Sequence, residues 1–173
     1  MKTVIILAMH GMSPKDFPRN EVVELNNLHN KLELESGAER ESLEKRRREL
    51  DLKVRQWPRN AINDPYHAAS QSLGRHLARA SENDVIVGFN EYCAPSLDEC
   101  FDMAVSKGAE QVIVVTPMMT RGGSHSETDI PEVIRAAKKK HPKLTVLYAW
   151  PFDDSQIAEF LASQIQKFAV SLK

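Results

Sequence analysis

The sequence predicts an α/β protein, a three-layer sandwich in which helices flank a four-stranded parallel sheet. Two observations lead to this fold class. Four short runs are rich in valine and isoleucine and hardly alternate with polar residues, which is typical of strands buried on both faces. Helical patterns lie between and after these runs, and such alternation favours a parallel sheet. The predicted strands are residues 3–9, 84–90, 111–117 and 144–150.

Capping and breaking residues delimit the helix that follows the second predicted strand. Residues 96–107 begin with Ser96 and Glu99 at the spacing of a capping box. Gly108 follows the last of these residues, and glycine is a common stop for a helix. The spacing therefore predicts a helix between the second and third strands.

Two further helices are predicted towards the end of the chain. Residues 129–140 carry Pro131 in the first turn and three lysines in the last turn, which suits the helix dipole. Residues 153–171 place a stripe of apolar side chains on one helical face. This stripe consists of Ile157, Phe160, Leu161, Ile165 and Phe168.

The interval between the first two predicted strands, residues 10–83, is far longer than the roughly 30 residues of a strand–helix–strand unit. Its surplus is charged and helical. Helices are predicted at 20–35, 37–57 and 65–80, and the last of them is the ordinary crossover helix. We therefore expect a single domain, residues 1–173, with a helical hairpin inserted at about 12–64 after the first strand.

The inserted hairpin carries an apolar stripe of its own in its second predicted helix. The stripe is formed by Leu43, Leu50, Val54 and Trp57. Such a stripe must be buried against another surface. The insertion could therefore be a lid over a binding site or an arm that contacts a second subunit.

The composition excludes several classes of protein. The chain has 173 residues, of which 42% are hydrophobic, and this suits one domain with a real core. The net charge of −1 creates no strong field that would favour nucleic acid or a membrane. No apolar run approaches the roughly 20 residues of a membrane span. The run at 4–9 is also too short for a secretory signal.

The two cysteines indicate the compartment. Cys93 and Cys100 form neither a CxxC motif nor a disulfide framework. We therefore expect a reducing, cytoplasmic location.

Three loops are selected by the rule that ligands bind outside the carboxyl ends of strands in open parallel sheets. His10 follows the first strand, Glu91 the second and His125 the third. Two imidazoles and a carboxylate are thus expected at one edge of the sheet. Histidine and glutamate bind borderline divalent metals well, and a neutral imidazole can accept a proton near neutral pH. These three residues form the candidate metal-binding and catalytic site.

Each candidate residue also has a purely structural interpretation. A single histidine in a surface loop is most often only a polar residue, and Glu91 could serve the dipole of the 96–107 helix. Cys93 is interpreted as a small buried hydrophobe rather than a ligand. The basic run at 45–48 alternates with acidic residues, which is typical of a solvated helix face. The other histidines are interpreted as structural or solvated, namely His29, His67, His76 and His141.

Three segments carry a recognisable pattern. They read "VIILAMHGM", "FNEYCAPSLDECFDMAVSKGAEQVIVVTPMM" and "RGGSHSETDIPEVIRAAKKKHPKLTVLYAWP". Together they resemble class II chelatases of the CbiX type, the sirohydrochlorin cobaltochelatases and their ferrochelatase relatives, in their short single-core form. The resemblance covers residues 3–11 and roughly 84–165. It implies a flavodoxin-like (chelatase-like) sheet and a lyase-type enzyme. That enzyme would insert Co²⁺, Fe²⁺ or Ni²⁺ into sirohydrochlorin or a related tetrapyrrole, in cobalamin or siroheme biosynthesis.

The resemblance also implies the roles of the three candidate residues. His10 and His125 fall on the motif histidines of the family and would hold the metal. Glu91 falls on its acidic residue and would complete the site or accept a pyrrole proton. Met12 stands where relatives more often carry serine, and the helical insertion is not typical of the short form.

A tetrapyrrole of this kind carries many carboxylates and a flat macrocycle, and four residues are predicted to bind it. Arg121 can pair with a carboxylate, because guanidinium and carboxylate match as a bidentate pair. Gly122 and Gly123 would let the backbone turn sharply and approach a flat ligand closely. Met118, with Met119, could floor the macrocycle, although a core role fits equally well.

Residues around the candidate site receive structural interpretations. The cationic residues near the insertion are interpreted as surface residues that favour solubility, namely Lys15, Arg19 and Arg59. Ser126 or Thr128 is predicted to cap the helix that begins near residue 129.

The resemblance and the motifs of the sequence together predict the cofactors and partners. Short members of the family typically pair as homodimers, so a homodimer is expected, with the metal as substrate. The sequence shows no GxxxxGK[ST] motif for ATP and no phosphate loop for a flavin. A histidine phosphatase would need arginine where Met9 stands. A non-catalytic carrier of metal or tetrapyrrole, built on the same fold, would use the same three ligands and remains the alternative.

Overall fold

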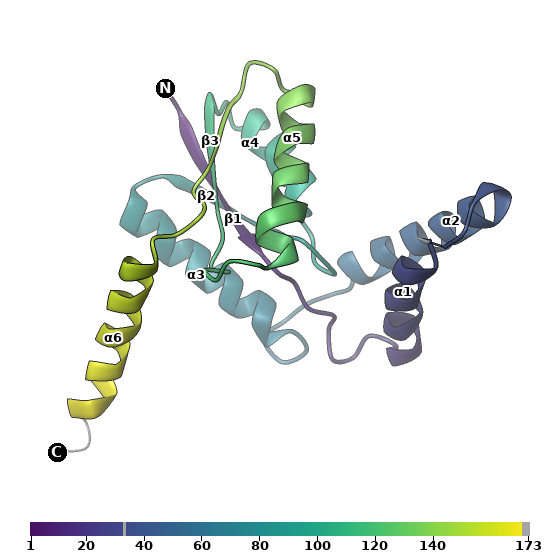
Figure 1. The fold of residues 1–173 in the computed structure, drawn as a ribbon, viewed down its shortest axis with the longest axis horizontal. Helices are drawn as coiled ribbons and strands as arrows, with labels where there is room; N and C mark the ends of the chain where they lie inside the picture. The colour runs from purple at the N-terminus through teal and green to yellow at the C-terminus, as the bar shows by residue number, and fades with distance from the viewer. Residues whose placement is uncertain (33, 171–173) are drawn as a thin grey trace.

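The computed structural model describes residues 1–32 and 34–170. Its strands form one sheet in the order β2-β1-β3-β4, and each neighbouring pair is parallel (Figure 1). The strands are β1 (Thr3–Met9), β2 (Asp84–Phe89), β3 (Gln111–Val115) and β4 (Thr145–Tyr148). The predicted α/β class and parallel sheet are therefore confirmed. The last two strands are shorter than predicted, because the chain leaves the sheet after residues 115 and 148.

Helices connect and follow these strands near the predicted positions. They are α1 (Arg19–Leu32), α2 (Gly37–Arg55), α3 (Pro65–Ser81), α4 (Leu97–Ser106), α5 (Ile130–Lys140) and α6 (Asp154–Val170), with a short π-helical turn η1 (His125–Asp129) before α5. The predicted capping box begins α4, since Ser96 Oγ accepts the Glu99 N–H and the Glu99 carboxylate accepts the Ser96 N–H. Two predicted helical positions, residues 33 and 171, lie outside the described residues.

The start of α5 differs from the prediction. Pro131 lies in the first turn as expected. Neither Ser126 nor Thr128 caps the helix, however, because the chain is already helical through η1 at these residues. The Ser126 hydroxyl instead donates a hydrogen bond to the carbonyl of Gly123 at 3.1 Å.

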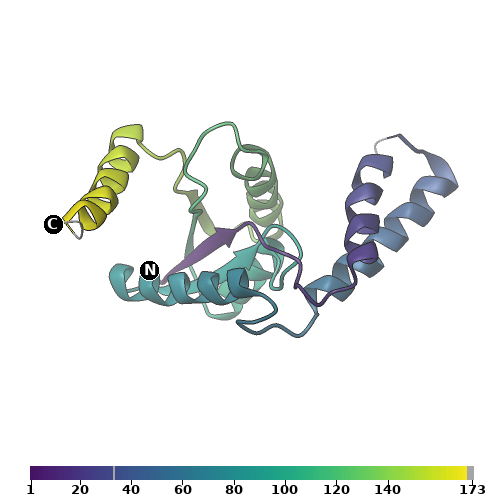
Figure 2. The ribbon, with the colours of Figure 1, turned by 90° about the horizontal axis from the view of Figure 1, so that it is seen from below.

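Helices on both faces bury the centre of the sheet (Figure 2). α4 and α5 cover one face, where Val4, Ile6 and Ala8 of β1 join the main hydrophobic cluster. α3 covers the other face over β1 and β2, where Leu7 and Met9 belong to a second cluster. β1 is thus buried on both faces, which explains why its sequence is a continuous apolar run.

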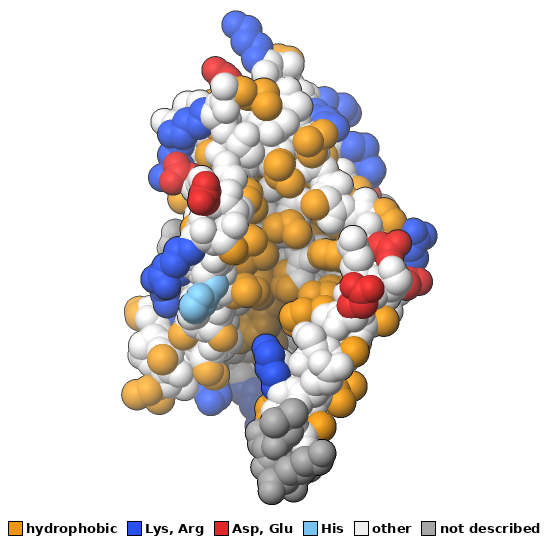
Figure 3. Space-filling view, turned by 90° about the vertical axis from the view of Figure 1, so that its left-hand side faces the viewer, with side chains coloured by type: hydrophobic (Ala, Val, Ile, Leu, Met, Phe, Trp, Pro, Cys, Tyr) orange, Lys and Arg blue, Asp and Glu red, His pale blue; other side chains and the backbone are white. Residues whose placement is uncertain are grey.

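The helix α6 leaves the sheet after β4 and runs away from it (Figure 1). Within the described ranges, it makes no extended contact with the sheet or with another helix. The predicted apolar stripe exists, but most of it is exposed, with Phe160 at 57%, Leu161 at 53%, Ile165 at 68% and Phe168 at 67%. Figure 3 looks onto this side, where hydrophobic side chains gather around a hollow beside α6.

The helices α1 and α2 pack on each other and project from the sheet as an arm, the α1–α2 arm (Figure 2). Salt bridges join them, from Arg46 to Glu24 at 2.7 Å and from Lys53 to Glu21 at 2.7 Å. Only the C-terminal part of the predicted apolar stripe is buried, at the base of the arm, whereas Leu43 is half-buried. Its residues Leu50 and Val54 are buried, and Trp57 meets Phe17 edge to face at 5.0 Å.

Arg59 ties the base of the arm to the loop after β2, because its guanidinium donates to the carbonyl of Tyr92 at 2.5 Å. Its side chain is only 6% exposed and forms an ion pair with Asp64, whose side chain is 1% exposed. Its guanidinium also donates to the carbonyls of Val54 at 2.9 Å and Met12 at 3.0 Å. The interpretation of Arg59 as a surface residue is therefore wrong, whereas Lys15 and Arg19 are exposed as expected. The pattern of charges alone did not reveal that this arginine would be enclosed by two loops.

Among the described residues, no helix combines the length and the apolar character needed to cross a membrane.

We predict that the Asp64→Ala substitution lowers the free energy of unfolding by about 3–5 kcal/mol, because it leaves the charge of Arg59 buried without its partner. It also removes the acceptor for the His67 N–H at the start of α3. Urea denaturation measures the change. The control is Glu44→Ala, which breaks the exposed pair with Arg40 and is expected to cost less than about 1 kcal/mol. Equal small losses in both variants would contradict the structural role of the buried pair.

Candidate metal centre

Three side chains from three loops meet at the carboxyl edge of the sheet. His10, Glu91 and His125 each offer a ligand atom, and these atoms all lie within 4.8 Å of one another. The two imidazole rings meet edge to face with their centroids 4.5 Å apart, and His125 Nε2 lies 3.5 Å from Glu91 Oε1. The convergence expected from the strand order is present. The metal-binding and catalytic roles of these residues stay predictions.

The pairing of β1 with β2 continues past the strand ends and sets His10 beside Glu91. The N–H of Asn90 donates to the carbonyl of Met9, and the N–H of Glu91 donates to the carbonyl of His10, both at 2.9 Å. Gly11 has a φ of +104°, and a Cβ there would lie 1.9 Å from the carbonyl oxygen of Glu91. Only glycine therefore permits the two loops to approach this closely.

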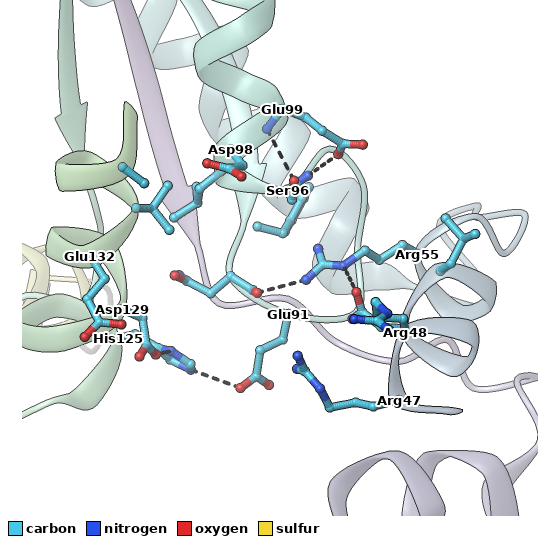
Figure 4. Close-up of a pocket in the computed structure, with 17 residues that line it drawn as sticks. Arg47, Arg48, Arg55, Glu91, Ser96, Asp98, Glu99, His125, Asp129 and Glu132 are labelled. Atoms are coloured by element: carbon cyan, nitrogen blue, oxygen red, sulfur yellow. Dashed lines mark hydrogen bonds and ion pairs between the residues drawn. The ribbon is translucent and has the colours of Figure 1, made fainter. Parts of the chain in front are cut away.

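Hydrogen bonds orient both histidine rings in the same way. His10 Nδ1 lies 2.8 Å from the carbonyl oxygen of Gly11, and His125 Nδ1 lies 2.6 Å from Asp129 Oδ2. Because a carbonyl and a carboxylate only accept, each Nδ1 is assigned the proton, and each Nε2 keeps its lone pair. Partners of this kind fix the tautomer of metal-binding histidines. Figure 4 shows His125 pointing at Glu91, with Asp129 behind it.

Glu91 and His125 of the cluster line a cavity with a volume of about 890 Å³. One wall is α2, and the opposite wall is formed by the start of α4 together with η1 and α5; Glu91 and His125 lie between the walls (Figure 4). A second cavity of about 430 Å³ is lined by residues 117–120 and 123–126, so His125 borders both. The larger volume is typical of sites for small organic ligands.

The residues predicted to bind a tetrapyrrole lie on the second cavity or near it. Met118 and Gly123 line the second cavity, and Met118 also packs against the main core. Gly122 adopts a φ of +85°, so the expected sharp turn is present at this glycine. Arg121 and Gly122 are exposed and line neither of the two cavities. Substrate binding by these four residues stays a prediction.

Arginines of the α1–α2 arm are the residues that sequence reasoning missed. Arg47 and Arg48 belong to the basic run and are exposed as interpreted, but they also line the larger cavity. Arg47 extends towards Glu91 (Figure 4) and makes no hydrogen bond or ion pair with the described residues. Helical spacing places Arg47, Asp51 and Arg55 on one side of α2. No pattern in the sequence indicates which part of the molecule this side of α2 faces.

Arg55 lines the same cavity, but its guanidinium is already bonded to neighbouring residues. Its guanidinium is engaged with Asp51 at 2.8 Å and donates to the backbone carbonyls of Cys93 at 2.6 Å and Asn90 at 3.0 Å. The arginine therefore attaches α2 to the loop that carries Glu91.

Cys93 and the other described histidines lie outside the cluster. Cys93 is fully buried, as expected, and burial raises the pKa of its thiol. His67 stacks on Phe89 with centroids 5.3 Å apart, and burial lowers its pKa. His76 is exposed, and His141 pairs with Asp102 at 2.8 Å. The side chain of His29 lies outside the described part of the chain.

Curated relatives are similar to part of this chain. It is 30% identical over 82 residues to a sirohydrochlorin ferrochelatase of Priestia megaterium, which covers 47% of this chain and 30% of that protein. It is 33% identical over 86 residues to a sirohydrochlorin cobaltochelatase of the same organism, which covers 49% and 28% respectively. The chain thus matches less than a third of the length of these two relatives. A sirohydrochlorin cobaltochelatase of Sulfolobus acidocaldarius is 28% identical over 116 residues, or 66% of this chain and 83% of the relative.

Solved structures share the fold at low sequence identity. A cobalamin biosynthesis CbiX protein from Marinobacter aquaeolei VT8 superimposes with a TM-score of 0.57 at 18% identity and covers 99% of both chains. The sirohydrochlorin chelatase SirB from Bacillus subtilis, in complex with cobalt, gives a TM-score of 0.52 at 17% identity. That match covers 96% of this chain and 51% of SirB. The model of the CbiX family matches residues 63–168, well over half of the chain, and the protein therefore belongs to the CbiX family.

Proposed function

We propose that the protein is a metal chelatase, a lyase that inserts Co²⁺, Fe²⁺ or Ni²⁺ into sirohydrochlorin or a related tetrapyrrole without ATP, in cobalamin or siroheme biosynthesis. The observation that carries the proposal is the cluster of His10, Glu91 and His125 beside a cavity of about 890 Å³. The family and the names of the curated relatives support the substrate class.

Insertion exchanges two pyrrole protons for one divalent metal ion. His10 and His125 would hold the incoming ion through Nε2, since each Nδ1 is occupied by an oxygen acceptor. Three ligands leave at least one coordination position open, through which the ion can pass to the pyrrole nitrogens. Glu91 is 40% exposed at its side chain, so it can bind the ion or take up a pyrrole proton and release it to solvent.

The two walls of the cavity differ in charge, and this difference would orient a bound substrate. Arg47 and Arg48 stand on the α2 wall, whereas the opposite wall carries acidic side chains. These are Asp98, Glu99, Asp129 and Glu132. Peripheral carboxylates of a tetrapyrrole would be attracted to the arginines and repelled by the acidic wall. We propose that the arm binds these carboxylates, together with Arg121, and that the macrocycle lies next to Glu91 and His125.

We further propose that residues 1–173 are one chelatase-like domain in which residues 12–64 are an insertion. The insertion would act as a fixed wall of the substrate site rather than a lid, because Arg55 and Arg59 bind it to the backbone carbonyls of the loop after β2. We also propose a homodimer. The match to about half of SirB supports it, since two copies of this chain would equal that length.

The decisive measurement is turnover. We expect the purified protein to accelerate the absorbance change of sirohydrochlorin with Co²⁺, Fe²⁺ or Ni²⁺ above the rate with metal alone. His125→Ala is expected to lower kcat at least about 100-fold, because the incoming ion loses one of its ligands, and loss even of a partner that only orients a ligand costs about 10–100-fold. His141→Ala is the control, because His141 is also paired with a carboxylate but lies away from the cluster. Metal or tetrapyrrole binding without acceleration would instead support the non-catalytic carrier.

We predict that Asp129→Asn weakens Co²⁺ binding about 10–100-fold, because the carboxylate that orients His125 is lost. Calorimetric titration of the metal without tetrapyrrole measures this directly. Asp102→Asn is matched to it, since Asp102 accepts from His141 at 2.8 Å in a similar pair. Equal affinities in the two variants would exclude the orienting role of Asp129.

Replacing Arg47 and Arg48 by alanine together is expected to raise KM for the tetrapyrrole about 10-fold or more with little change in kcat, because charge-assisted contacts to carboxylates are lost. Lys45→Ala is the control, since it removes a cation of the same run that does not line the larger cavity. Steady-state kinetics at varied tetrapyrrole concentration distinguishes the two. A KM shared by both variants would argue against the arginine wall.

A further inference from the structure

The guanidinium of Arg59 contacts both of the loops that carry His10 and Glu91. Its Nη1 donates to the carbonyl of Met12 at 3.0 Å, and its Nη2 donates to the carbonyl of Tyr92 at 2.5 Å. Met12 stands two residues after His10, and Tyr92 directly follows Glu91. A guanidinium is planar and rigid, so the separation of its two terminal nitrogens also sets the separation of the two carbonyls.

Two helices hold this guanidinium in place. The carboxylate of Asp64 forms the buried ion pair with Arg59 and also accepts the N–H of His67 in the first turn of α3. On the other side, Arg59 Nη2 donates to the carbonyl of Val54, in the buried last turn of α2, at 2.9 Å. The arginine is thus fixed to α2 and α3, and from these fixed points it holds the two loops.

The backbone at Tyr92 has a conformation that such a contact can impose. Its φ is +55°, in the left-handed region that residues with a side chain seldom occupy. A conformation of this kind costs free energy and persists where the surrounding contacts require it. The hydrogen bond from Arg59 to the Tyr92 carbonyl is one of these contacts, and the preceding residue is Glu91. Release of the carbonyl would therefore let the chain relax at Tyr92 and move Glu91.

The bonding of Arg59 favours a role beyond stability. Its Nε is buried and has no hydrogen-bond partner among the described residues. An unsatisfied buried donor lowers stability, and a buried ion pair is often no more stabilising than apolar side chains of similar volume. Apolar side chains, however, could not hold the loop carbonyls. The position of Arg59 is thus explained better by what its terminal nitrogens bind than by the stability that it adds.

We propose that Arg59 is a positioning residue of the metal centre, whose guanidinium fixes the distance between the loops of His10 and Glu91 and so holds these two side chains at the spacing that one ion needs. Arg59 lines neither of the two cavities and acts through the backbone of Met12 and Tyr92. Ligands that are held in place before the ion arrives lose less freedom on binding, which raises the affinity. This inference rests on the proposed metal site but not on the proposed turnover of a tetrapyrrole.

The variant Arg59→Lys separates the charge from the planar fork, because lysine keeps a cation for Asp64 but cannot hold both carbonyls at a fixed separation. We expect the affinity for Co²⁺, measured by calorimetric titration without tetrapyrrole, to fall about tenfold or more, as it does when groups that orient metal ligands are lost. The matched control is Arg46→Lys, which removes the two bonds of an exposed arginine to Glu24 in the same arm and is expected to leave the affinity unchanged. Equal affinities in the two variants would overturn the proposal.

Hydrogen exchange in the metal-free protein, followed by NMR, tests the contact between the loops. The amide of Glu91 donates to the carbonyl of His10, so its exchange rate reports whether the two loops stay together. The reference is the amide of Ile6 in the middle of β1. In Arg59→Lys, the exchange of Glu91 is expected to accelerate at least about tenfold more than that of Ile6, because a bond from a charged donor is lost locally. A purely structural role would accelerate both amides equally, and this result would overturn the proposal.

If Arg59→Lys does not fold, a variant without the ion pair replaces it. Arg59→Gln with Asp64→Asn leaves no unpaired buried charge, and asparagine is as good a cap for α3 as aspartate. The same loss of Co²⁺ affinity and the same acceleration at Glu91 are expected, and unchanged values would overturn the proposal. If the unsubstituted protein binds no Co²⁺, the proposed metal site is wrong, and the exchange of Glu91 alone decides whether Arg59 holds the loops together.

Discussion

The parallel pairing of β1 between β2 and β3 is the constraint on which the rest of the structure depends. Because the three strands are parallel and adjacent, their carboxyl ends meet at one edge, and the loops that follow them must emerge side by side. The hydrogen bonds that join Asn90 to Met9 and Glu91 to His10 extend this pairing into the loops. Gly11 lies against the Glu91 carbonyl, where any side chain would clash. The cluster of His10, Glu91 and His125 is thus a direct product of strand order and register.

This origin explains why the three-residue cluster could be predicted from the sequence. Continuous runs of valine and isoleucine indicate buried parallel strands. The loops that follow these strands then place His10, Glu91 and His125 at one edge of the sheet, and this prediction requires no side-chain contact to be known. The capping box of α4 was equally predictable, since a cap depends on residues three positions apart. The π-helical turn at His125 was not, because a run of polar residues before Pro131 reads equally well as a capped helix start.

Features that depend on contacts between distant segments could not be predicted. Arg59 and Arg47 are both cations of the inserted region, yet one is enclosed between loops and the other lines a cavity. Their local sequences do not distinguish them, because the difference lies in where the base of the arm meets the sheet. The stripe on α6 shows a similar limit. Periodicity correctly placed its apolar side chains on one face, but the surface that covers them is not encoded in the spacing of residues along a helix.

The way in which the α1–α2 arm is anchored determines which nearby side chains can be substituted. Arg55 and Arg59 hold the loop after β2 by the backbone carbonyls of Asn90, Tyr92 and Cys93. Every amino acid supplies a carbonyl, so the side chains of this loop can be replaced without loss of the anchor. In the proposed metal site, a substitution of Glu91 would therefore change a ligand without loss of the anchor, because neither arginine bonds to its side chain. The backbone of this loop is thus held in place whatever side chain stands at position 91.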